Sequence, residues 1–102
     1  MVFKRRRYKD VIERQLELFA SEDGDLLEDV DRALERYNAG DRDDAEELYG
    51  DYQLAIEAAT DRLAELRDSF ARTLEDPDAY VAEFNRAVVE RWRELGLTIE
   101  SS

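Results

Sequence analysis

Aspartate and glutamate are the abundant side chains of this chain that could perform acid–base or metal chemistry. The 102 residues include 27 of them, but no histidine and no cysteine. The chain therefore lacks the commonest general base, the commonest transition-metal ligand and every thiol. A catalytic pair would have to consist of carboxylates, and it must be sought at positions that the fold is expected to bury.

The positions expected to be buried carry almost no acids. The longest apolar stripe, between residues 45 and 74, has Thr73 as its only polar member, and the first stripe has only Gln15. The acids gather where helices are expected to start, and the helix dipole stabilises them there. Their two densest runs are Glu22, Asp23, Asp25, Glu28, Asp29 and Asp31, then Asp41, Asp43, Asp44, Glu46 and Glu47.

Neither acidic run has a glycine at the position that an EF-hand loop requires. A di-iron site in a helical bundle would need Glu-x-x-His, and glycine-rich phosphate loops are missing as well. We therefore expect a protein that is not an enzyme and that holds no metal and no cofactor.

Residues 1–7 form a basic arm that merges into the first helix. The cations of this region are Lys4, Arg5, Arg6, Arg7 and Lys9. They give residues 1–9 a charge of +5, although the whole chain has a formal net charge of −12. A run of this kind can bind nucleic acid or an anionic membrane surface. The same cations could instead neutralise part of the acidic body, and both interpretations stay open.

Apolar residues spaced three and four apart predict four helices. These helices are expected over residues 4–21, 26–38, 44–75 and 77–95, with residues 97–102 as a frayed tail. Glycines that tolerate a left-handed conformation are expected to end three of them, at Gly24, Gly40 and Gly96. Asp76 and Pro77 are expected to start the last one, since proline costs nothing at a first helical position.

The helix at about residues 44–75 is predicted to be the longest element. Its apolar residues alternate between spacings of four and three, which is the heptad pattern of a coiled-coil-like seam. The positions are Ala45, Tyr49, Tyr52, Ile56, Ala59, Leu63, Leu66 and Phe70. At 1.5 Å per residue the helix would be about 50 Å long, and it needs packing partners along that whole length.

The turn before the long helix resembles the inter-helix turn of a tetratricopeptide hairpin. Gly40-Asp41, Ala45 and Tyr49 match the glycine–aspartate, small-residue and aromatic positions of that family. We interpret the segment as a tight helical hairpin and carry over no peptide binding, because no second copy follows and such arrays need several repeats.

These elements predict an all-α fold, with residues 1–102 as one domain. We expect an elongated, mostly antiparallel bundle of about four helices around the long one. Short connections require the second and fourth helices to run antiparallel to its N-terminal and C-terminal halves. Leu48, Leu54 and Ala55 widen the apolar stripe in the N-terminal half, so the first helix is expected to pack there.

The C-terminal half of the long helix would then have only the fourth helix as a neighbour. Unless the first helix extends to that end, a second copy of the chain or another helical protein must cover the remaining apolar area. The residues expected in that interface are Leu66, Phe70, Phe84 and Trp92.

The sequence thus favours a small, non-catalytic protein–protein interaction or assembly module, with a homodimer as the first expectation. The alternative is an accessory protein that binds nucleic acid or an anionic membrane surface through the basic arm. We expect a cytoplasmic protein, because no apolar run approaches the ~20 residues of a membrane span and no signal-peptide core is visible.

Overall fold

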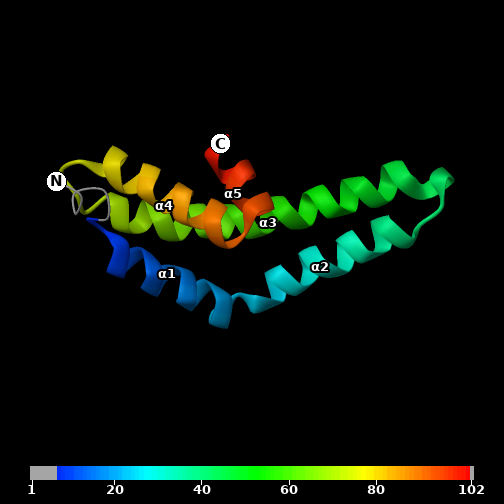
Figure 1. Cartoon of the computed structure of the whole chain (residues 1–102), viewed down its shortest axis with the longest axis horizontal. Helices are drawn as coiled ribbons and strands as arrows, with labels where there is room; N and C mark the ends of the chain where they lie inside the picture. The colour runs from blue at the N-terminus through cyan, green and yellow to red at the C-terminus, as the bar shows by residue number, and fades with distance from the viewer. Residues whose placement is uncertain (1–6, 102) are drawn as a thin grey trace.

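The computed structural model describes residues 7–101, and it is built from five α-helices and one short 3-10 helix within that range (Figure 1). In chain order the elements are α1 (Lys9–Glu22), α2 (Gly24–Ala39), η2 (Arg42–Asp44), α3 (Ala45–Ala71), α4 (Pro77–Arg91) and α5 (Arg93–Glu100). Of the described residues 87% are helical, and none of them lies in a strand. The predicted all-α fold is confirmed.

The longest helix, α3, is the axis of the molecule. Figure 1 shows α2 running antiparallel along its N-terminal half, while α4 runs antiparallel along its C-terminal half and α5 lies over its middle. The described part of the chain measures 52 × 24 × 22 Å. An elongated, mostly antiparallel arrangement is therefore correct.

The first helix packs at the other end from the one expected. Its buried residues Ile12, Leu16 and Phe19 belong to the same core cluster as Leu63 of α3 and Phe84 of α4. The reason is that α1 leads into α2 with only a bend at Asp23, so both helices follow the same direction under α3 (Figure 1). Since α2 occupies the N-terminal half of α3, α1 can cover only the C-terminal half.

The left-handed conformation expected for the glycines at the helix ends is wrong. No glycine among the described residues has a positive φ, and Gly40 is extended, with φ −78° and ψ 164°. Gly24 is the first residue of α2, and the bend before it is fixed by Asp23, whose carboxylate accepts a hydrogen bond from Arg62 Nε on α3 at 3.2 Å. This contact between distant residues ties the bend between α1 and α2 to α3.

The fourth predicted helix is two helices, and the frayed tail is part of the second one. The backbone is extended at Trp92, with φ −137° and ψ 89°, so α4 ends at Arg91 and α5 begins at Arg93. Ile99 is 1% exposed, which shows that the end of the chain packs onto the core. The break lets Leu95 and Ile99 turn back onto α3, and burial of these side chains compensates for the interrupted helix.

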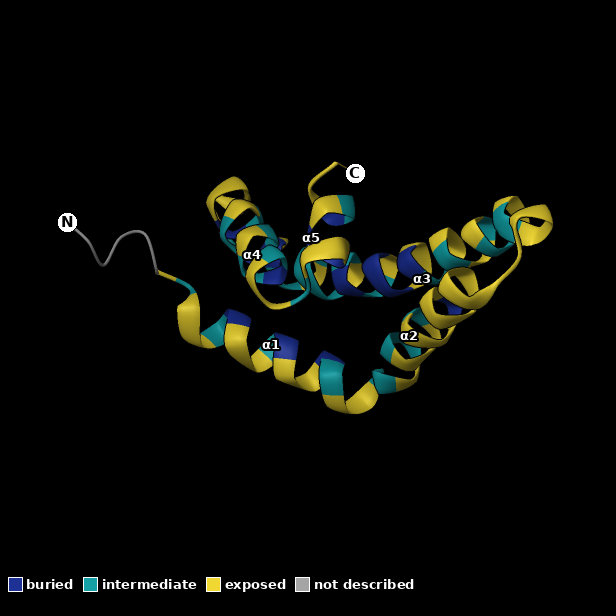
Figure 2. Cartoon of the chain, turned by 45° about the vertical axis from the view of Figure 1, so that its right-hand side comes forward, coloured by how far each residue is buried: buried dark blue, intermediate teal, exposed yellow. Residues whose placement is uncertain are grey.

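Most of the core lies at the end of the molecule where α1, α3 and α4 pack together, which we call the three-helix end. Figure 2 shows buried residues on α1, α4, α5 and the middle of α3, whereas the hairpin of α2 and α3 is mostly intermediate or exposed. The buried members are Ile12, Leu16, Phe19, Ile56, Ala59, Leu63, Ala71, Tyr80, Phe84, Val88, Leu95 and Ile99. The buried residues of α3 thus begin at Ile56, and its apolar stripe is left partly open before that residue.

Candidate functional site

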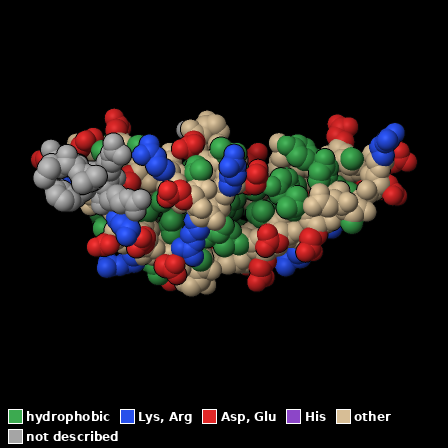
Figure 3. Space-filling view, in the orientation of Figure 1, with side chains coloured by type: hydrophobic (Ala, Val, Ile, Leu, Met, Phe, Trp, Pro, Cys, Tyr) green, Lys and Arg blue, Asp and Glu red, His purple; other side chains and the backbone are tan. Residues whose placement is uncertain are grey.

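The open end of the molecule carries most of its exposed apolar side chains. Six large apolar residues are exposed in the described part of the chain, and the four on the α2–α3 hairpin are Leu34, Tyr37, Tyr49 and Leu54. The space-filling view shows hydrophobic side chains gathered over this half of the molecule (Figure 3). Isolated exposed apolar residues are ordinary, but a cluster of them is typical of an interaction surface.

A groove runs between α2 and α3 on the side that α5 closes. It has a cavity volume of about 330 Å³. Its lining consists of Leu27, Val30, Asp31, Leu34, Tyr52, Ile56, Trp92, Arg93, Glu94 and Leu95. A smaller cavity of about 170 Å³ shares Tyr52, Ile56 and Glu94 with it and extends to Tyr49. We call the two adjoining cavities the hairpin groove.

Aromatic rings continue the groove towards the tip of the hairpin. The Tyr49 ring lies 5.5 Å from Tyr37 on α2 and 6.3 Å from Tyr52 on α3, measured between ring centroids. At the other end Trp92 contacts the buried Phe19 edge-on at 5.5 Å, and the Arg91 guanidinium lies 4.7 Å above its ring. Trp92 therefore separates the closed core from the open groove.

The groove and its surroundings are acidic. Asp31, Glu57 and Glu94 line its two cavities, against the single cation Arg93. The wider hairpin, residues 25–57, contains twelve acids and three arginines. Burial, together with the negative charge of Glu94, raises the pKa of the Tyr52 hydroxyl. An apolar floor with an acidic rim suits a ligand that combines apolar and cationic groups.

The predicted interface residues are dispersed rather than gathered. Phe84 is 0% exposed inside a single chain, so it offers no surface, while Leu66 and Phe70 are half-buried against the core. Trp92 alone lies in the groove. Leu34, which lines the groove, was not among the predicted residues, because the first helix was expected over that half of α3. The useful signal was present, since the N-terminal stripe of α3 is wider than α2 alone can cover.

The structure places two of the five candidate cations, and both have neighbours in their own chain. Lys4, Arg5 and Arg6 lie outside the described residues. The Arg7 guanidinium lies 5.0 Å above the Tyr8 ring, and Lys9 forms an exposed ion pair with Glu13 at 3.6 Å. Exposed pairs of this kind are weak, so another anionic group could replace the contacts that Arg7 and Lys9 make within the chain.

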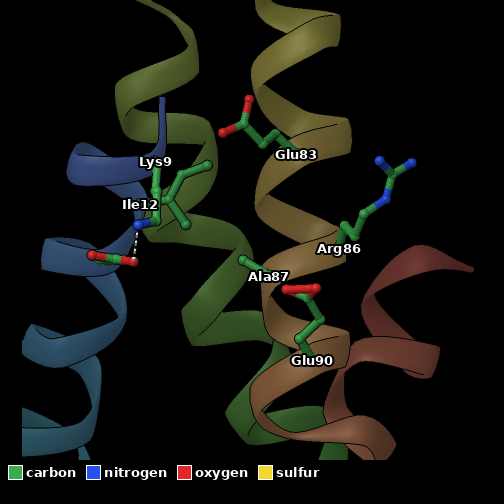
Figure 4. Close-up of a pocket in the computed structure, with 7 residues that line it drawn as sticks. Lys9, Ile12, Glu83, Arg86, Ala87 and Glu90 are labelled. Atoms are coloured by element: carbon green, nitrogen blue, oxygen red, sulfur yellow. Dashed lines mark ion pairs between the residues drawn. The ribbon is translucent and has the colours of Figure 1, made fainter. Parts of the chain in front are cut away.

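A second cavity of about 270 Å³ lies between α1 and α4. Figure 4 shows its charged lining, with Glu83 directed towards α1 and Arg86 directed away. The Tyr8 amide donates a hydrogen bond to the Glu83 carboxylate at 3.2 Å, which ties the start of α1 to α4. Five of its seven lining residues are charged, two of them cations and three of them acids. We therefore interpret the cavity as the polar contact zone between two helices and not as a ligand site.

In residues 7–101 no group of three acidic side chains is placed to hold a metal ion. Across the same range, none of the helices combines the length and apolar character needed to cross a membrane. Comparison of the chain with family models, with curated proteins and with solved structures finds no match to any of them.

Proposed function

We propose that this protein is a small, non-catalytic assembly module of the cytoplasm, and that it associates with a second copy of itself through the hairpin groove. The observation that carries the proposal is the unsheltered apolar floor formed by Leu34, Tyr52 and Trp92. Burying such a floor releases water from apolar surface, which is the main favourable term in protein association.

The contrast between the two ends of α3 supports the position of this surface. In the second half of α3 Leu63 is 0% exposed, because side chains of α1 and α4 join it in the core cluster. At the N-terminal end the same helix has only α2, and Tyr49 remains 45% exposed. The apolar stripe of α3 is thus better covered in its second half than in its first, and a partner helix or segment would bury most additional area at the first half.

The proposal is tested by placing a charge in the groove. We expect Leu34→Arg to raise the dimer dissociation constant roughly tenfold or more, because it replaces an apolar contact with a charge that must be desolvated. Leu34 is 37% exposed in the single chain, so the substitution should leave the helix folded. Sedimentation equilibrium over a range of protein concentrations measures the change.

Leu18→Arg provides the matched control. Leu18 is 46% exposed on α1 and does not line the hairpin groove. This variant should associate as the unmodified chain does. A chain that stays monomeric at all concentrations, or one whose association responds equally to both substitutions, would refute the groove as the assembly surface.

A further inference from the structure

We infer that the hairpin groove of one copy receives the basic arm of a second copy, and that two copies exchange their arms reciprocally. The inference rests on the proposed function, because it names the segment that occupies the assembly surface. Three features support it: the charges of the two segments, the length of the arm, and the position of the start of α1 and of the α2–α3 hairpin at opposite ends of the molecule.

The charges of arm and groove are complementary. The hairpin that forms the groove has twelve acids against three arginines in residues 25–57, whereas residues 1–9 carry five cations and no acid. Two identical acidic hairpins would repel each other if they met face to face. The basic arm is the one segment of this chain that an acidic groove attracts, and its Val2 and Phe3 supply apolar groups for the floor.

The arm is too short to fill the groove of its own chain. The 14 residues of α1 separate the arm from the bend at Asp23, a distance of about 21 Å. The groove has one edge at Trp92, beside Phe19 of α1, but its α2 wall begins only beyond the bend, at Leu27. Phe3 precedes Arg7 by four residues, so even a fully extended arm carries it at most about 14 Å from Arg7. The occupant must therefore come from another molecule.

The shape of the molecule makes the exchange reciprocal. Figure 1 shows that α1 starts at the three-helix end, whereas the α2–α3 hairpin extends to the opposite end. When two such chains lie antiparallel, the start of each α1 approaches the groove of its partner. A two-fold axis then creates two identical arm–groove contacts, which close the assembly as a dimer.

The first experiment is a complementation test with full chains. One variant lacks residues 2–6 and keeps its groove, and the other carries Leu34→Arg and keeps its arm. Each variant alone should be monomeric at a concentration where the unmodified chain is a dimer. Mixed in equal amounts, they should form a heterodimer through the one remaining arm–groove contact, and sedimentation velocity should detect its mass.

The outcomes separate this inference from the proposed function. If the chain lacking residues 2–6 dimerises like the unmodified chain while Leu34→Arg does not, the arm is not the occupant, although the groove is still the interface. If the mixture of the two variants stays monomeric at concentrations well above the dissociation constant of the unmodified dimer, the exchange is refuted as well.

The second experiment measures the contact directly with a peptide of residues 1–9. The chain has a single tryptophan, Trp92, and it lines the groove, while the peptide has none. Adding the peptide to the chain that lacks residues 2–6 should shift Trp92 fluorescence with saturation. The affinity should fall as salt is added, because screening weakens the contacts between arm cations and groove acids.

A peptide in which Lys4, Arg5, Arg6 and Arg7 are replaced by glutamate is the matched control. It should bind at least tenfold more weakly, and Leu34→Arg in the receiving chain should abolish the response to the original peptide. Equal binding of both peptides would overturn the inference. So would a peptide that binds heparin or anionic vesicles but leaves Trp92 unchanged, and that result would favour the polyanion-binding alternative.

Discussion

At the scale of single residues, Tyr80 has the least favourable environment in the core. It is 0% exposed, and its ring contacts Tyr8 edge-on at 5.2 Å and Phe70 at 4.9 Å between centroids. Its hydroxyl is buried and has no hydrogen-bond partner among residues 7–101. A buried polar group without a partner loses its bonds to water and gains nothing in return.

We expect Tyr80→Phe to raise the free energy of unfolding by about 1 kcal/mol, because the ring contacts stay and the unpaired hydroxyl is removed. Tyr49→Phe is the control, since Tyr49 is 45% exposed and its hydroxyl meets solvent, so it should change stability little. Urea denaturation followed by circular dichroism measures both variants. A loss of stability on Tyr80→Phe would mean that the hydroxyl is satisfied in solution.

The same residue makes stability depend on alkaline pH. Burial, together with the charge of Glu83, raises the pKa of Tyr80 to about 12, compared with 10.0 for the free side chain. The folded state thus favours the neutral phenol, and this contribution is complete below pH 10 and is lost as the pH rises towards about 12. The stability difference between Tyr80→Phe and the unmodified chain should therefore widen between pH 10 and 12.

At the scale of elements, the junction of α4 and α5 depends on Gly96. Gly96 is buried within α5, and a Cβ atom at this position would collide with the backbone and side chain of Val89 on α4. The glycine therefore permits two consecutive helices to touch at their crossing, and it does not end a helix. Gly50, in the interior of α3, faces open space instead.

These two glycines should respond in opposite directions to alanine. Gly96→Ala should destabilise the protein by about 1–3 kcal/mol, since the backbone of Val89 cannot yield without moving α4. Gly50→Ala should stabilise it by about 1 kcal/mol, because alanine is the better helix former and meets no neighbour. Thermal unfolding of both variants checks the signs, and equal signs would contradict the close approach of α4 and α5.

The elements themselves could be predicted, but some of their boundaries could not. Periodic apolar residues identified α1, α2 and α3, and Asp76-Pro77 marked the start of α4 correctly. The break at Trp92 has no local signal, because neither glycine nor proline stands there, and it is stabilised by burial of Leu95 and Ile99. A boundary that depends on distant contacts is invisible to local propensity.

At the scale of the whole molecule, the sequence predicted the overall architecture but not the hairpin groove. Short connections fixed the directions of α2 and α4 relative to α3, because a short turn leaves only an antiparallel path. Local sequence did not determine where α1 packs, since its position depends on the bend at Asp23 and on the contact of Asp23 with Arg62. Because α1 was expected at the other end, the sequence pointed to Phe84, which is buried in the core, and did not point to Leu34, which lines the groove.

The uneven covering of α3 also has a consequence for motion. The hairpin end buries little, with Ala33 as the only fully buried residue of α2, whereas the other end contains most of the core. Regions with few buried contacts open locally at a lower free energy than the whole molecule unfolds. We expect amide hydrogens of α2 and the first half of α3 to exchange faster than those of α4 and the second half of α3.

Hydrogen exchange measured by mass spectrometry at two protein concentrations would detect this difference. Uniform protection along α3 in the monomer would contradict it. If association closes the open end, raising the concentration should slow exchange in the hairpin first. One continuous helix, α3, would then have a stable C-terminal half and an N-terminal half that unfolds locally. Binding at the N-terminal half would lower the frequency of that local unfolding.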